Sequence, residues 1–180
     1  MSMFSQTFET LKRFKSVSSA QLTNYAHAKG HSFSASSLRT MQRGTKRTVN
    51  TDVLLGVGLF FAVSPSFLLE GKPHNSDLYG FSEEGRGVTA FLVAPVLMSL
   101  VDYLAEYEPS MNGEKKNWKE TKERGYSATL TSLDDSLRGE RHDYPTFPVT
   151  FDGVVVGLAL NEDKACWLEE RIVKAASHNS

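Results

Sequence analysis

The chain of 180 residues contains one cysteine, Cys166, so it cannot form a disulfide within itself. A lone cysteine is typical of a reducing compartment and is most often a small buried side chain. The strongly apolar stretch that begins at Val88 stops before Asp102 and has 14 residues, whereas a helix that crosses a bilayer needs roughly 18. The start of the chain does not have the pattern of a signal peptide. We therefore expect a cytoplasmic protein with no membrane partner.

Motifs for catalysis and for metal binding are also scarce. His74 with Asp77, and His142 with Asp143, are the nearest approach to an acid–base or metal-binding pair. Each pair lacks a third ligand, or an oriented nucleophile, at a diagnostic spacing. The sequence therefore predicts a protein that is not an enzyme and that needs neither a cofactor nor a metal.

Acidic residues are few in the first part of the chain, and basic residues are the minority in the remainder. The totals are balanced, with 20 Lys and Arg against 21 Asp and Glu. Residues 1–72 hold nine basic and three acidic residues, a net charge of +6, and residues 73–180 hold eleven and eighteen, a net charge of −7. A cationic module joined to an anionic one is the pattern expected when only the first meets DNA.

The segment from Phe33 to Gly71 has the most informative order of signals. Ser34 can cap a helix, in which Leu38 and Met41 face a core, and Gly44 suits the position after its last turn. A basic turn at 45–48 follows. Further helices are predicted from apolar spacing, caps and stops. They cover Phe8 to Phe14, Ser19 to Gly30, Asp52 to Ala62 behind an Asn50 or Thr51 cap, and a short helix that begins at Ser64-Pro65.

This order of five helices over residues 7–71 resembles the lambda-repressor-like (Cro or XRE type) helix-turn-helix domain. The spacing from Gly30 to Ser34 is wider than in the phage repressors and is more similar to actinobacterial regulators of the family. The resemblance implies that the helix beginning at Ala35 enters the major groove of DNA. The implied base contacts are Ala35, Ser36, Arg39 and Thr40. The implied phosphate contacts, which set the register, are Ser19, Gln21, Ser34, Ser37, Arg43, Lys46 and Arg47.

The second half of the chain resembles no family. Residues 73–87 are rich in Gly, Ser, Pro and charge and predict a linker. Residues 88–107 predict an apolar helix that Pro95 kinks or splits. Its apolar face is the first candidate for a dimer interface, and the last helix of the chain is the second. The candidate interface residues are Leu92, Val96, Leu100 and Leu104.

Later signals predict an α+β domain over residues 88–180. Leu130, Leu133 and Leu137 predict a short amphipathic helix. Asp152-Gly153 between two apolar runs predicts the tight turn of a β-hairpin, and Asn161 caps a terminal helix. The predicted fold is thus a mainly α N-terminal helix-turn-helix domain of five helices, followed by an α+β domain with a β-hairpin and a terminal helix.

The sequence favours a transcriptional regulator, a repressor of host or prophage origin, that binds double-stranded operator DNA as a homodimer near the nucleoid. The alternative is a protein-interaction adaptor, such as an antitoxin or anti-repressor, whose acidic domain captures a basic partner protein. A third hypothesis is a domain that senses a small-molecule effector. In this hypothesis the aromatic residues near the hairpin line a pocket; they are Tyr144, Phe147, Phe151 and Trp167.

Overall fold

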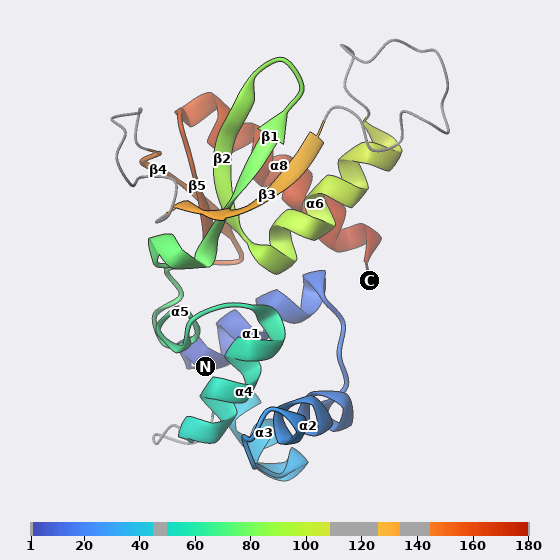
Figure 1. Ribbon diagram of the computed structural model, residues 1–180, viewed down its shortest axis with the longest axis vertical. Coiled ribbons are helices and arrows are strands. Elements are labelled where there is room, and N and C mark those ends of the chain that lie inside the picture. The colour runs from blue at the N-terminus through green and yellow to red at the C-terminus, as the bar shows by residue number, and fades with distance from the viewer. Residues whose placement is uncertain (1, 45–49, 109–125, 134–144, 180) are drawn as a thin grey trace.

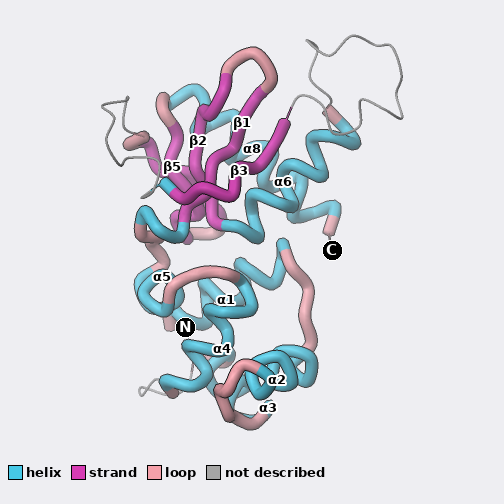
Figure 2. The backbone as a smooth tube through the Cα atoms, viewed as in Figure 1, coloured by secondary structure: helices cyan, strands magenta, loops and turns pink. Residues whose placement is uncertain are grey.

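The computed structural model describes residues 2–44, 50–108, 126–133 and 145–179. Within these ranges the chain forms seven α-helices and one five-stranded antiparallel sheet (Figure 1). Residues 2–72, the helical part, lie at one end of the molecule, and residues 73–179, the sheet part, lie at the other (Figure 2). Within the described ranges, no helix combines the length and the apolar character that crossing a membrane requires.

The helical part consists of five helices, as predicted. They are α1 (Met3–Phe14), α2 (Ser19–Ala28), α3 (Ala35–Gln42), α4 (Thr51–Phe61) and α5 (Pro65–Glu70). The predicted caps form: the side chains of Ser34, Asn50 and Ser64 each accept a hydrogen bond from a backbone N–H in the first turn of α3, α4 and α5. Gly71 ends α5 with φ 69°, a left-handed conformation that glycine adopts without strain.

The sheet part places two helices on one face of the sheet. The elements are η1 (Asn75–Asp77), β1 (Leu78–Glu83), β2 (Gly87–Val93), α6 (Ala94–Tyr107), β3 (Tyr126–Ser132), β4 (Phe147–Phe151), β5 (Val154–Ala159) and α8 (Glu162–His178). The strands lie in the order β3-β1-β2-β5-β4, and each neighbouring pair is antiparallel. Helices α6 and α8 pack against this sheet and against each other.

The predicted linker at 73–87 is wrong, because this segment contains η1 and β1. Gly85 and Gly87, which suggested a flexible connection, have φ angles of 83° and 73° and form the turn between β1 and β2. The predicted helix at 88–107 is correct only from residue 94 onward. Residues 90–93 are consecutively buried and pair with β1 and β5, and Pro95 lies in the first turn of α6, where a proline costs no hydrogen bond.

The proposed dimer interface is also corrected by the structure. Leu92, Val96, Leu100 and Leu104 are each 0% exposed, because they fill the core of their own chain. Side chains without exposed surface cannot form a subunit contact in the folded chain.

The short amphipathic helix predicted from Leu130, Leu133 and Leu137 is wrong at its start. Leu130 lies in β3 and not in a helix, while Leu137 is outside the described residues.

The hairpin and the terminal helix are confirmed. Asp152 and Gly153 both have positive φ, at 49° and 81°, between β4 and β5. The Asn161 side chain accepts a hydrogen bond from the Lys164 N–H at the start of α8, at 2.8 Å. Cys166 on this helix is exposed, contrary to the buried position expected from its residue type.

The two parts share one core. The buried apolar side chains of residues 4–68 and 78–176 form a single continuous cluster. The Phe14 ring of α1 packs edge-on against Phe151 of β4, with centroids 5.0 Å apart. The Val155 N–H donates to the Gly71 carbonyl at 3.0 Å. The boundary near residue 72 therefore marks a change of composition, while the packing is continuous across it.

A buried carboxylate also connects the two parts. Asp77, which is 3% exposed, accepts hydrogen bonds from the Ser64 N–H at 2.7 Å, from the Ser64 hydroxyl at 2.8 Å and from the His74 N–H at 2.9 Å. These bonds tie the cap of α5 to the turn before β1. In the pair of His74 and Asp77, the Asp77 carboxylate thus bonds to the backbone N–H of His74. The His74 imidazole instead lies 4.0 Å from the Glu70 carboxylate.

Candidate nucleic-acid interface

Helices α2 and α3 lie at the end of the molecule farthest from the sheet (Figure 1). Helix α2 ends in a turn in which Gly30 has φ 89°. The Gly30 N–H donates to the His27 carbonyl at 3.1 Å, and the His31 N–H donates to the Ala26 carbonyl at 2.9 Å. This bonding pattern closes a helix end and reverses the chain direction. Residues 31–34 then lead into α3.

Phe33, which lies between α2 and α3 in the sequence, is buried against α4 and is 6% exposed. A Cβ atom added at Gly56 of α4 would lie 2.8 Å from the Phe33 ring and 2.7 Å from the Ala26 Cβ. No L side chain fits there without a shift, so α4 and α2 approach closely because residue 56 is glycine. This contact was not predicted from the sequence, because it joins residues distant along the chain.

Helix α3 buries one side and leaves the other free. Leu38 is 0% exposed and Met41 is 6% exposed, as the spacing predicted. The Gln42 carbonyl accepts a hydrogen bond from the Ser5 hydroxyl, and the Gln42 amide donates to Glu9, so the end of α3 is fastened to α1. Of the predicted base-contacting residues, Ser36 and Arg39 are exposed, and Ala35 and Thr40 are half-buried.

The hydroxyl groups at the start of α3 and along it differ in their remaining capacity to form hydrogen bonds. The Thr40 hydroxyl donates to the Ser36 carbonyl at 2.9 Å, so it can only accept a hydrogen bond from a base. Ser34 accepts from the Ser37 N–H and donates to the Ser37 hydroxyl, both at 3.0 Å. Ser36 and Arg39 are thus the side chains best placed to donate outward.

The start of α2 presents polar groups as well. The Ser18 hydroxyl accepts from the Gln21 N–H at 3.1 Å, and the Gln21 side-chain oxygen accepts from the Ser18 N–H at 3.0 Å. This reciprocal cap uses the oxygen of Gln21 and leaves its amide hydrogens able to donate. Ser19 is half-buried beside it. A helix start with free N–H donors is a favourable place for a phosphate.

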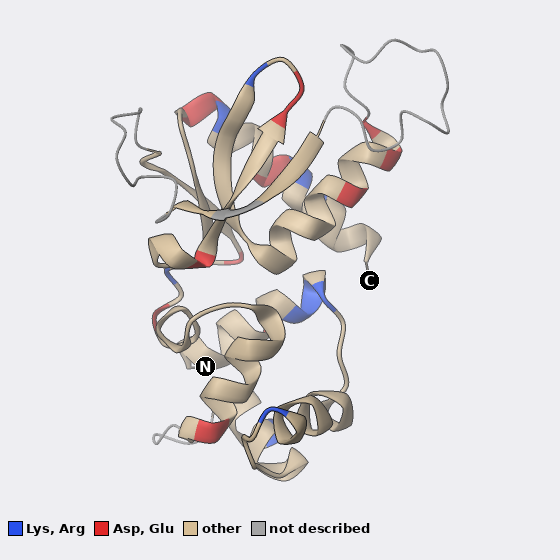
Figure 3. Cartoon of the chain, viewed as in Figure 1, with Lys and Arg blue, Asp and Glu red and all other residues tan. Residues whose placement is uncertain are grey.

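Cations and carboxylates are unevenly distributed (Figure 3). Within the described ranges, Arg39 and Arg43 are exposed and form no ion pair. Two carboxylates of the helical part have other partners: Glu9 accepts a hydrogen bond from the Gln42 amide, and Asp52 lies 3.7 Å from the His31 imidazole. Lys46 and Arg47, the two other predicted phosphate contacts, lie outside the described residues.

The three described aromatic residues of the pocket suggested near the hairpin have different neighbours. Phe151 is buried against Phe14, Trp167 stacks with Tyr126 at a centroid distance of 6.2 Å, and Phe147 is 38% exposed at the sheet edge. Tyr144 lies outside the described residues. Among the residues that the structure describes, there is also no group of three or more His, Cys, Asp or Glu side chains that could hold a metal ion.

Comparison with known proteins adds no assignment to this geometry. No family model matches the chain, and no curated protein and no solved structure matches it significantly.

Proposed function

We propose that the chain is a transcriptional regulator that binds double-stranded DNA through a helix-turn-helix formed by α2 and α3. In this proposal α3 enters the major groove, where Ser36 and Arg39 read base edges. Ala35 and Thr40 approach them more closely as small side chains. Ser19, Gln21, Ser34, Ser37 and Arg43 contact phosphates, together with Lys46 and Arg47.

One observation carries this proposal. Arg39 and Arg43 lie four residues apart on the exposed side of α3, and neither is paired with a carboxylate within the described ranges. Two unpaired guanidinium groups one helical turn apart attract an extended anion. They belong to residues 1–72, with a net charge of +6, and the excess of acidic residues lies in the remainder of the chain.

Specific binding requires two such chains. A single small module buries too little surface for high specificity, whereas a dimer places two α3 helices at half-sites about one helical turn apart, roughly 34 Å. We therefore propose a homodimer that acts as a repressor. The buried leucines of α6 do not form its interface, and the dimer uses side chains exposed on the folded chain.

Binding of the full chain to duplex DNA tests the proposal. A preferred sequence is first selected from a pool of random duplexes, and binding is then followed by fluorescence anisotropy at several salt concentrations. Arg39→Ala is expected to weaken the preferred duplex by roughly tenfold more than a random duplex. Arg43→Ala, Lys46→Ala and Arg47→Ala should weaken both duplexes alike, and each should reduce the salt slope by about one unit.

Arg86→Ala is the matched control, because Arg86 is an exposed cation in the β1–β2 turn, at the opposite end of the molecule (Figure 1). This variant should bind both duplexes like the parent chain. Equal losses for Arg39→Ala and Arg86→Ala would contradict the assigned interface. A stoichiometric basic protein that copurifies with the chain, combined with no salt-dependent DNA binding, would instead support the adaptor function.

A further inference from the structure

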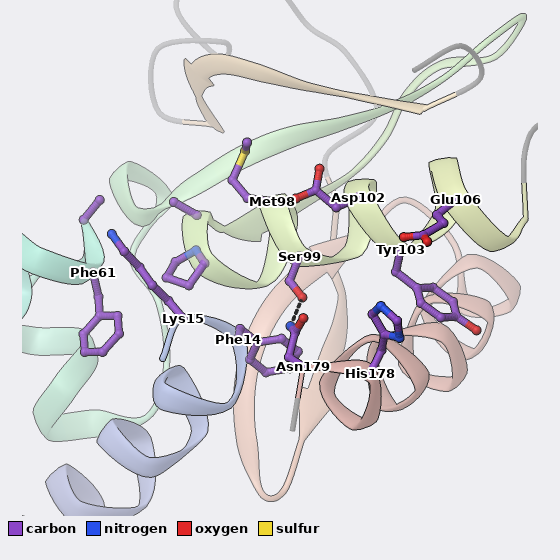
Figure 4. Close-up of a pocket in the computed structure, with 13 residues that line it drawn as sticks. Phe14, Lys15, Phe61, Met98, Ser99, Asp102, Tyr103, Glu106, His178 and Asn179 are labelled. Carbon is purple, nitrogen blue, oxygen red and sulfur yellow. Dashed lines mark hydrogen bonds between the residues drawn. The ribbon is translucent and has the colours of Figure 1, made fainter. Parts of the chain in front are cut away.

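A cavity of about 430 Å³ lies where the ends of α1 and α4 meet α6 and α8 (Figure 4). This volume is within the range of sites that hold small organic ligands, about 300–1,000 Å³. Apolar atoms of Phe14, Ala62, Pro95 and Met98 form part of the wall. Met98 is 52% exposed, so a ligand that enters would cover apolar surface that is now in water. The cavity can therefore stabilise an apolar body.

Three helices end at this cavity. The C-cap residues of α1, α4 and α8 all line it; they are Lys15, Ala62 and Asn179. Each C-terminus has a partial charge of about −0.5 from its free carbonyl groups, and such ends favour cations. One N-terminus, that of α6, also borders the cavity, but Pro95 in its first turn has no N–H to donate.

Two carboxylates add full negative charges to the same place. Asp102 and Glu106 are one turn apart on α6, both are exposed, and both line the cavity (Figure 4). Neither forms an ion pair with any cation in the described part of the chain. Among the described lining residues Lys15 is the one Lys or Arg, and its ammonium donates to the Phe60 carbonyl at 3.0 Å. With Asp102 and Glu106 the lining still has one net negative charge.

Aromatic rings complete the lining. Tyr103 and His178 have ring centroids 6.3 Å apart, and both line the cavity (Figure 4). The faces of aromatic rings attract cations, and the neighbouring Lys15 illustrates this, since its ammonium also lies 4.3 Å from the centroid of the Phe60 ring. Helix ends, carboxylates and rings thus favour the same sign of charge.

We propose that this cavity binds a small organic cation, an amine or a quaternary ammonium compound with an apolar body. The charge would lie near Asp102 and Glu106, and the apolar body would cover Met98 and Pro95. Because the ligand would contact both the helical and the sheet part, it would stabilise the fold. This site is independent of DNA binding, and it is tested without DNA.

Calorimetric titration of the full chain with phenethylamine and with 3-phenylpropionate provides the test, because the two compounds share a phenyl body and differ in charge. The amine is expected to bind one site saturably, at least tenfold more tightly than the carboxylate. Asp102→Asn and Glu106→Gln keep the side-chain shape and should each weaken the amine about threefold. Together they should weaken it about tenfold.

Asp163→Asn is the matched control, since it removes an exposed carboxylate from the first turn of α8, about 22 Å along the helix from His178. This variant should bind the amine like the parent chain, and circular dichroism verifies that all variants are folded. The proposal is overturned if the amine shows no saturable binding, or if the carboxylate binds as tightly. It is also overturned if Asp163→Asn weakens binding as much as Asp102→Asn does.

Discussion

The cations of the sheet part and the two arginines of α3 differ in their partners. In the sheet part, Lys164 lies 2.9 Å from Glu83, and Arg171 lies 3.3 Å from Glu108. In the helical part, Arg39 and Arg43 are exposed and have no carboxylate partner within the described ranges. These cations of the sheet part therefore contribute to contacts within the chain, and those of α3 have no ion pair within the described ranges.

Trp167 contacts both of these cations of the sheet part. The Lys164 ammonium and the Arg171 guanidinium both lie 4.2 Å from the centroid of its indole. The indole in turn stacks with Tyr126 and packs near Phe81. Substitutions in the two parts test this difference.

Lys164→Ala is expected to lower the free energy of unfolding by about 3 kcal/mol, because it leaves the Glu83 carboxylate nearly buried without a partner. The side chains are 10% and 11% exposed. Urea unfolding followed by circular dichroism measures the change. Lys174→Ala, in an exposed ion pair of the same helix with Glu170, is the control and should cost less than about 0.5 kcal/mol. Similar losses for the two variants would mean that the buried pair contributes no more than an exposed one.

Asp77→Ala is expected to cost about 2 kcal/mol, because it leaves the Ser64 and His74 N–H groups without their acceptor. The same urea titration measures the loss, and the two parts should still unfold in one transition, since they share a core. Glu84→Ala, at an exposed position, is the control and should change little. Two separate transitions in the parent chain would show that the parts are less coupled than their packing indicates.

Gly56→Ala is expected to cost about 1–2 kcal/mol, because the added methyl group meets Ala26 and Phe33 at sub-van der Waals distances. It should also weaken DNA binding by the folded protein, since α2 must move relative to α4. Leu55→Ala, which alters an exposed neighbour on α4, is the control for stability. If Gly56→Ala left both properties unchanged, α2 would not be held by this contact.

Arg39→Ala and Arg43→Ala are expected to change the free energy of unfolding by less than about 0.5 kcal/mol, the usual range for exposed positions. This loss is far smaller than the one expected for Lys164→Ala. Thermal unfolding measures it on the same preparations used for DNA binding. A loss above 1 kcal/mol for either variant would show that these arginines serve the fold.

The helical part was predictable because its signals are local. Ser34, Asn50, Ser64 and Gly44 act on the backbone within a few residues, and each performs its expected role. The Asp152-Gly153 turn is local in the same sense. Signals of this kind can be read one segment at a time, without knowledge of what packs against the segment.

The sheet was largely missed, because its strands depend on distant partners. Residues 90–93 are buried on both faces of the sheet, so they show no alternation and resemble the start of a helix. Tyr79 pairs with Ser132, far along the chain. The cavity was missed for the same reason, since four helices that are separate in the sequence line it. Which apolar side chains of β2 and α6 stay exposed was equally hidden, so the predicted interface residues were wrong.

The contact between Phe14 and Phe151, together with the bond from Val155 to the Gly71 carbonyl, has a practical consequence. A fragment cut after residue 72 would expose the phenyl ring of Phe14 to water and would lose the hydrogen-bonding partner at the end of α5. Such a fragment should be less stable and more prone to aggregate than its compact five-helix outline suggests. Crystallisation or NMR of the helices with a duplex should therefore retain the hairpin of β4 and β5.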